Sequence, residues 1–411
     1  MIPISKAINI IKRETGTLAM ERVDLGDGVG RILAESIYAD TDMPPFDRSQ
    51  MDGYAIVAAD TAEAPIKLRI VGESAAGNGW HRKMKRGEAV RIMTGAPVPA
   101  GADAVVKVEL TSSGNVPFRN SGTHGANRKD FVEILQPVEK GTSIIKKGAE
   151  IRKGKLVIAS GETVTVNGIS TIAAFGYSKI RVARRPRVGI LSTGSEIVEV
   201  DKKPGRDQIR NSNSIMLKAM AESCGAVADA FPVASDDLAD LKSQIKTASR
   251  NKDILIITGG VSVGKYDLTK DALAELGAQI FFDKVRLKPG KPAVFGRLGK
   301  TLVFGLPGNP VSSAVTFYLF VRTALLQMQG SKRTQLTRGT AVLAGKAKAA
   351  RERDTFLPSS LASDNKGQLV VTALKWQGSS DFVGFGRSDS LIFLPAGKAC
   401  EAGELVGIRY L

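Results

Sequence analysis

The hydrophobic pattern is clearest between residues 184 and 330, where short apolar runs alternate with segments of helical spacing. Residues 187–191 and 253–257 have the continuous apolar character of buried strands. Residues 214–223 have the spacing of an amphipathic helix, and a longer apolar helix is predicted to follow from Val311. Strands that alternate with helices of this length predict a parallel sheet with right-handed crossover connections.

Short alternating strands separated by glycine and proline flank this region on both sides. The predicted fold class is therefore a multidomain protein of α/β and all-β parts. A parallel-sheet α/β domain is flanked by small β domains and by a C-terminal β-barrel-like domain. The predicted boundaries are 1–44 together with 138–183 for an N-terminal linking domain, 45–137 for a small β domain inserted in it, 184–330 for the α/β domain, and 331–411 for the C-terminal β domain.

Polar, glycine-bearing turns follow successive strands of the predicted α/β domain. In an open parallel sheet, ligands bind beyond the carboxyl ends of the strands, so these turns are expected to converge on one site. They supply carboxylates, hydroxyl groups and free backbone amides. The turns are residues 192–196, 234–237, 258–267 and 305–310.

The acidic residues of these turns are Glu196, Asp236, Asp237 and Asp267. Carboxylates beside a glycine-rich anion loop are explained by Mg²⁺, which binds one or two carboxylates together with substrate phosphate oxygens. The alternative is that Asp236, Asp237 and Asp267 are N-caps of the helices that they precede, each worth about 1 kcal/mol. For Asp236 and Asp237 the sequence leaves both readings open, whereas the glycine loop around Asp267 favours a metal ligand.

The basic part of the predicted site is the segment Lys288-Pro-Gly-Lys291. Two prolines restrict the segment 288–292, and a lysine about 4 Å from an anion contributes roughly 1–4 kcal/mol, depending on the local dielectric. Backbone amides of Gly259, Gly260 and Gly264, and a helix beginning near Ser312, add further anion donors. The alternative for the lysine segment is a solvated basic turn. The alternative for the segment before Ser312 is an ordinary helix start initiated by proline.

Composition narrows the class of function. The 58 Lys and Arg against 41 Asp and Glu give a net charge of +17, which suits either a nucleic-acid surface or small polyanions. Scattered basic residues and 6% aromatic content argue against specific nucleic-acid binding. Two cysteines and two histidines exclude a disulfide framework and a His-rich zinc site. The amphipathic start of the chain and the lack of a membrane-length apolar run predict a cytoplasmic protein with no membrane partner.

Six motifs in this order resemble the molybdopterin molybdenumtransferase family, which includes MoeA and the E domain of gephyrin. The motifs are FDRSQMDGYA from Phe46, MTGAPVP from Met93, STGSE from Ser192, TGGVSVGKYD from Thr258, KPGKP from Lys288 and GLPGNPVSS from Gly305. The resemblance implies an enzyme of molybdenum cofactor biosynthesis. It would cleave adenylylated molybdopterin with Mg²⁺, insert molybdate or tungstate, and release AMP. It further implies a homodimer, with the molybdopterin adenylyltransferase as a candidate partner.

The motifs also carry residue roles to this chain. The resemblance implies catalytic roles for Asp47, Thr94, Glu196, Asp267, Lys284 and Lys288, and Mg²⁺ ligation by Asp236 and Asp267 with Glu196 beside them. Residues of the substrate and oxyanion pocket would be Gly259, Gly260, Ser262, Gly264, Lys288, Lys291, Pro307, Gly308, Pro310 and Ser312. In the family, the small β domain of one subunit faces the sheet domain of the other, so Asp47 and Thr94 would act across the dimer.

Three positions depart from the family pattern: Arg48 stands where asparagine is frequent, Glu150 where aspartate is usual, and Lys265 where an acidic residue is common. Two other functions are open from the sequence. One is a molybdopterin adenylyltransferase that uses ATP, although such an enzyme does not need the flanking β domains. The other is a catalytically silent molybdopterin-binding scaffold, against which the complete set of Glu196, Asp267 and the two lysines argues.

Overall fold

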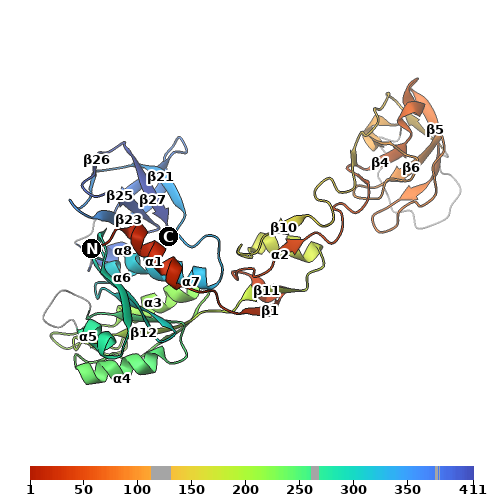
Figure 1. Cartoon of the computed structure of the whole chain (residues 1–411). Coiled ribbons are helices and arrows are strands. Elements are labelled where there is room, and N and C mark those ends of the chain that lie inside the picture. The colour runs from red at the N-terminus through yellow and green to blue at the C-terminus, as the bar shows by residue number, and fades with distance from the viewer. Residues whose placement is uncertain (113–130, 261–267, 375–377, 379) are drawn as a thin grey trace. The chain divides into compact units, whose positions relative to one another are not determined.

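The computed structural model describes residues 1–112, 131–260, 268–374, 378 and 380–411. Over this part the chain divides into two compact units (Figure 1). The first unit contains Met1–Glu35, Ala159–Ser170 and Ser178–Leu411, and the second contains Ser36–Ile158 and Thr171–Tyr177.

A six-stranded sheet is the centre of the first unit, in the strand order β15-β12-β16-β20-β19-β17. Its strands are β12 (Arg187–Ser192), β15 (Val227–Ala230), β16 (Ile254–Thr258), β17 (Gln279–Lys284), β19 (Pro292–Leu298) and β20 (Thr301–Leu306). The four strands β15, β12, β16 and β20 are parallel, as the sequence pattern predicts. The hairpin partner β19, which the pattern did not predict, runs antiparallel to both β20 and β17.

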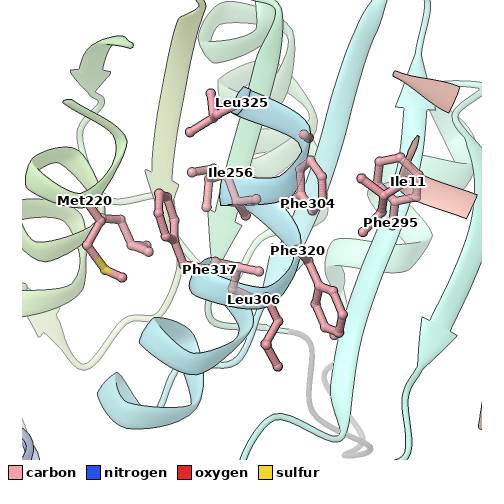
Figure 2. Close-up of a cluster of buried hydrophobic side chains, with 14 of the residues drawn as sticks. Ile11, Met220, Ile256, Phe295, Phe304, Leu306, Phe317, Phe320 and Leu325 are labelled. Carbon is pink, nitrogen blue, oxygen red and sulfur yellow. The ribbon is translucent and has the colours of Figure 1, made fainter. Parts of the chain in front are cut away.

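Helices cover both faces of this sheet because successive strand residues point to opposite sides. Ile256 packs on the face covered by α1, α3 and α6, whereas Leu255 and Ile257 pack on the face covered by α4 and α5. Figure 2 shows the first of these cores, in which Phe304 and Phe317 lie close to Ile256. The helices are α1 (Ile4–Glu14), α3 (Ser212–Ser223), α4 (Leu238–Ser249), α5 (Leu268–Glu275), α6 (Pro310–Thr316), the wide turn η4 (Phe317–Val321) and α7 (Arg322–Met328).

Among the described residues, the helical run Pro310–Met328 is long and apolar enough to cross a membrane by length and composition. However, 72% of its apolar window is buried inside the structure. Packing against the sheet therefore accounts for its composition.

The C-terminal part of the first unit is a closed β-barrel, because β23 pairs with both β24 and β25 in the series β23-β24-β21-β27-β25. The strand β18 (Leu287–Lys288) extends the barrel by pairing with the start of β23, and thereby joins the barrel to the α/β domain. The barrel elements are β21 (Arg338–Leu343), β22 (Ala347–Lys348), β23 (Asp354–Ser363), β24 (Leu369–Ala373), α8 (Phe382–Phe385), β25 (Ser390–Leu394), β26 (Ala399–Cys400) and β27 (Leu405–Tyr410).

The remaining short elements of the first unit are the antiparallel pair β1–β11 and two parallel bridging strands. They are β1 (Met20–Asp24), η1 (Leu25–Gly28), β11 (Lys179–Ala183), β13 (Ile197–Val198) and β14 (Ile209–Arg210), and the helix α2 (Val166–Ala174) has residues in both units.

The second unit is built on a five-stranded sheet in the order β7-β4-β6-β5-β8. Tyr54, Ile56 and Leu68 are fully buried in its core. Its elements are β2 (Ile37–Tyr38), β3 (Arg48–Ser49), β4 (Gly53–Ile56), η2 (Ala58–Thr61), β5 (Ile66–Ser74), β6 (Glu88–Ile92), β7 (Ala104–Lys107), η3 (Val108–Leu110), β8 (Phe131–Ile134), β9 (Ile144–Ile145) and β10 (Leu156–Ile158).

Candidate functional site

The carboxyl ends of β12, β16 and β20 open onto a cavity of about 1460 Å³ in the first unit. This is the place that the strand-end rule predicts for a ligand. The structure brings together on this cavity the predicted residues Glu196, Gly259, Gly260, Lys288, Lys291, Pro307, Gly308, Pro310 and Ser312.

The two glycines after β16 occupy a turn that a side chain would not fit. Gly259 has a φ of +98°, and a Cβ there would lie 2.4 Å from the Thr193 carbonyl oxygen. Gly260 has a φ of +61°, and its Cβ would lie 2.7 Å from Thr269 Oγ1. Both positions therefore require glycine for conformation and for space, and the backbone here faces the cavity without a covering side chain.

One asparagine holds the glycine turn and the following loop together. Asn213 Nδ2 donates to the Gly308 carbonyl oxygen at 2.7 Å and to Thr258 Oγ1 at 3.0 Å. Thr258 Oγ1 in turn donates to the Pro307 carbonyl oxygen at 3.2 Å. Gly308 lies so close that a Cβ there would be 3.6 Å from Gly259 Cα. The loops after β16 and β20 thus form one connected wall.

Two polar atoms in this wall lack a partner within the part of the chain that the structure describes. Thr193 Oγ1 and Asn213 Oδ1 are both buried and both belong to residues that line the cavity. A buried polar atom without a hydrogen bond costs free energy, so each of these two atoms requires a partner that the described residues do not supply.

The basic wall comes from the KPGKP turn and from the barrel. Gly290 has a φ of +110°, and a Cβ there would lie 2.5 Å from Thr316 Cγ2, so the turn is packed tightly onto α6. Lys288 pairs with Thr355 near the start of β23, and Arg353, the residue before that strand, also lines the cavity. The α/β domain and the barrel therefore share this site.

The charge of the cavity wall is strongly positive. Among the described lining residues the cations are Arg210, Lys288, Lys291 and Arg353, and the one carboxylate is Glu196. Lys288, Lys291 and Arg353 form no ion pair with any described carboxylate. Unpaired cations that converge on a cavity suit an anionic ligand of high charge density.

The structure separates the two neighbouring aspartates Asp236 and Asp237 by role. Asp237 Oδ1 accepts from the Asp240 amide at 2.8 Å and is the N-cap of α4. Asp236 is not that cap; its Oδ2 accepts from the Ser195 amide at 3.0 Å, in the turn that also carries Glu196. The N-cap reading is therefore confirmed for Asp237 and wrong for Asp236.

The donors present are compatible with Mg²⁺. Glu196 and Asp236 supply carboxylate oxygens next to one backbone turn, and Mg²⁺ commonly binds through one or two carboxylates, waters and substrate phosphates. Among the described residues, no group of three or more acidic, histidine or cysteine side chains is close enough to hold a metal alone. Ser262, Gly264, Lys265 and Asp267 lie outside the described residues.

Among the described residues, two predicted residues of the first unit, Lys284 and Asp236, do not line the cavity. Lys284 is the last residue of β17, and its carbonyl oxygen accepts from the Ile2 amide at 3.1 Å.

Asp47 and Thr94 belong to the second unit, where their two motifs are bonded to each other. The Asp47 carbonyl oxygen accepts from the Val98 amide at 2.8 Å, and the Thr94 amide and hydroxyl both donate to Asp52 Oδ1, at 2.6 and 2.9 Å. Burial alone would raise the pKa of Asp47, but hydrogen bonds from Lys146 Nζ and the Lys147 amide outweigh it and lower the pKa. Asp47 is therefore an ionised carboxylate.

Sequence reasoning missed several residues of the cavity wall: Arg210, Asn211, Asn213, Arg353 and Ser380. The polar run IRNSNS at 209–214 could have indicated the first three, because it links a strand to the start of α3. Nothing local marks Arg353 and Ser380, which reach the site through the position of the barrel.

Comparison with known proteins agrees with this architecture. Three family models match successive parts of the chain: the MoeA N-terminal region (domain I and II) over residues 2–176, a probable molybdopterin binding domain over 189–327, and the MoeA C-terminal region (domain IV) over 340–409. The fold and these matches thus define a multidomain protein of the MoeA type that contains a probable molybdopterin binding domain.

Full-length relatives give the particular family. The chain is 34% identical to the molybdopterin molybdenumtransferase of Bacillus subtilis, covering 99% of this chain and 93% of the relative, and 34% identical to that of Haemophilus influenzae, covering 95% and 93%. A solved molybdopterin biosynthesis MoeA protein of Pyrococcus horikoshii OT3 superposes with a TM-score of 0.82 at 29% identity, covering all of both chains. The chain belongs to the molybdopterin molybdenumtransferase family, whose enzymes act in molybdenum cofactor biosynthesis.

Proposed function

We propose that this enzyme inserts molybdate into adenylylated molybdopterin at the 1460 Å³ cavity and releases AMP in a Mg²⁺-dependent reaction. The observation that carries the proposal is the convergence on one cavity wall of glycine-turn amides and of cations that have no carboxylate partner among the described residues. A substrate with a phosphoanhydride and a tetrahedral dianion both require such donors, and the scarcity of histidine fits chemistry without a histidine base.

The oxyanion part of the site is formed by the KPGKP turn and the barrel. Lys288, Lys291 and Arg353 approach the cavity from the two ends of the β18–β23 pairing, and each cation near a dianion contributes roughly 1–4 kcal/mol. Tungstate has the same shape and charge, so these residues would accept it as well.

The phosphate part is formed by the glycine turn and its neighbours. Amides of the segment from Gly259 would hold the phosphoanhydride. Glu196, Asp236 and Asp267 would hold Mg²⁺, which when bound supplies charge neutralisation on the phosphate oxygens. Water adds to the phosphorus on the molybdopterin side as the bridging P–O bond breaks, the electron pair of that bond leaves with AMP, and a proton of the water passes to solvent. Lysine stabilises the developing charge.

The test is incubation of the full chain with adenylylated molybdopterin, Mg²⁺ and molybdate. We expect AMP release that depends on molybdate or tungstate. Lys291→Gln is expected to lower this rate by roughly 10²-fold, whereas Lys300→Gln, an exposed control outside the cavity, leaves it unchanged. Absence of AMP with every oxyanion would contradict the proposal. Release of pyrophosphate from ATP would instead indicate an adenylyltransferase, and substrate binding without turnover a scaffold.

Asp267→Asn tests the metal assignment directly. We expect it to abolish Mg²⁺-dependent AMP release while the far-UV circular dichroism and melting temperature stay those of the parent chain. Near-normal turnover of Asp267→Asn would refute its assignment as a metal ligand.

We further infer a homodimer in which Asp47 and Thr94 of one subunit complete the cavity of the other, as in the family. Mixing an Asp47→Asn chain with a Lys291→Gln chain, each of strongly lowered activity, is expected to restore part of the activity, because mixed dimers regain one intact site. If subunit exchange is verified and the mixture still gains no activity, Asp47 and Thr94 act in the site of their own subunit or in no site.

A further inference from the structure

A second cavity, of about 310 Å³, lies between α1, the η4 turn and the barrel in the first unit. Its walls are mainly apolar. They contain Ile4, Ile8, Tyr318, Leu319, Leu336, Phe356 and Phe393. The start of β23 separates it from the first cavity: Arg353 faces the first cavity, whereas Asp354 and Phe356 line the second.

Two arginines in this cavity wall lie side by side on neighbouring strands of the barrel. Arg338 on β21 and Arg409 on β27 are direct partners in the antiparallel register, and both line the cavity. Like charges directly opposite one another on neighbouring strands repel, so this arrangement destabilises the barrel unless something lies between them.

The described residues provide no anionic partner for either arginine. Arg338 Nη2 donates to Gln335 Oε1 at 3.0 Å, and Arg409 Nη1 donates to the carbonyl oxygen of the adjacent residue Ile408 at 2.8 Å. Burial lowers the pKa of Arg409, and the charge of Arg338 lowers it further.

The other charged member of the wall is Asp354, which is already engaged by the barrel. Its Oδ1 accepts from the Ala396 amide at 3.1 Å, and it forms no ion pair with either arginine. The Cζ atom of the Arg409 guanidinium lies over the Phe393 ring, 5.0 Å from its centroid, so the cation contacts the apolar wall.

We propose that this second cavity binds a small organic acid, with its single carboxylate held by Arg338 and Arg409 and its aromatic or aliphatic body against the apolar wall. Arginine binds carboxylates through paired N–H groups of matching geometry, and a cavity near 300 Å³ is at the lower end of the range for small-molecule sites. A polyanion is disfavoured because the rest of the wall is apolar and carries Asp354. This site would be separate from the molybdopterin cavity.

The test uses the intact chain and phenylacetate as the probe, with phenylacetamide as the matched uncharged control. Calorimetry or saturation-transfer NMR should detect phenylacetate at millimolar concentration, with the amide bound at least roughly tenfold more weakly. Arg409→Gln should weaken phenylacetate binding by roughly tenfold or more. Arg333→Gln, an exposed arginine outside the cavity wall, should bind it as the parent chain does.

A second measurement is independent of the choice of probe. Removing the exposed partner with Arg338→Gln should raise the melting temperature of the ligand-free chain, because it relieves the like-charge contact, while weakening phenylacetate binding. The proposal is overturned if the acid and the amide bind equally, if Arg409→Gln binds phenylacetate unchanged, or if no binding of phenylacetate, benzoate or hexanoate is detected. A lower melting temperature of Arg338→Gln would show that the arginine pair is satisfied within the fold and would also overturn it.

Discussion

Arg48 Nη2 donates a hydrogen bond to Glu150 Oε1 at 3.1 Å, and the two residues form an ion pair in the second unit. Both occupy positions at which this chain departs from the family pattern, where asparagine and aspartate are usual. The two departing positions are therefore in direct contact in this chain.

This pair is expected to contribute little to stability, because both side chains are considerably exposed, at 37% and 57%. Arg48→Gln and Glu150→Gln should each lower the free energy of unfolding by no more than about 1 kcal/mol. A double-mutant cycle by urea denaturation should give a coupling energy of about 0.2–1 kcal/mol. A coupling energy near zero would mean that the contact has no energetic role.

The glycine turn after β16 should not tolerate a methyl group. Gly259→Ala is expected to destabilise the chain by about 2 kcal/mol or more, because it combines a left-handed φ with overlap on the Thr193 carbonyl. Gly345→Ala, where nothing lies within 4 Å, is the matched control and should be close to neutral. Chemical denaturation of both variants compares them, and equal stabilities would contradict the steric argument.

Asn213 should act on substrate binding through the loop that it holds. Asn213→Ala removes the hydrogen bonds to Gly308 and Thr258, and Gly308 is exposed enough for water to replace the lost bond. We therefore expect a higher KM with a smaller change in kcat and little change in melting temperature. Lys218→Ala, on the exposed side of the same helix, is the control. A fall in kcat with unchanged KM would instead place Asn213 at the reacting atoms.

Asp253 should make stability depend on pH in the acid range. Burial alone would raise its pKa, but the Arg184 guanidinium, at 2.7 and 2.8 Å, and the Arg187 amide lower the pKa below the usual value of an aspartate. A carboxylate with a lowered folded-state pKa stabilises the fold above its unfolded value, and that stability is lost as the pH falls through the folded value. Asp253→Asn should cost roughly 1.5–3 kcal/mol at neutral pH.

The variant should also lose less stability than the parent chain on acidification below about pH 4. Melting temperatures of both chains between neutral and acid pH provide the measurement. Parallel pH profiles would show that Asp253 does not titrate in this way.

Much of the fold and part of the site follow from the sequence because the rules involved are local. Apolar runs mark the buried strands β12 and β16, and parallel strands place their following turns at one edge of a sheet. Glu196, Gly259 and Pro307 could therefore be assigned to one cavity without coordinates. The strand β19 was missed because it begins at the last proline of the KPGKP segment. The hydrophobic pattern there does not distinguish a strand of a hairpin from a continuation of the turn.

What the sequence by itself determined is the set of turns that meet at the strand ends, together with their charges, because periodicity and glycine positions are properties of a short segment. The tertiary structure alone decided which of Asp236 and Asp237 caps α4, and it brought Arg353 from the barrel to the cavity at the strand ends. It also set Arg338 opposite Arg409. These relationships depend on hydrogen bonds and strand registers between segments far apart in the chain, which no local pattern specifies.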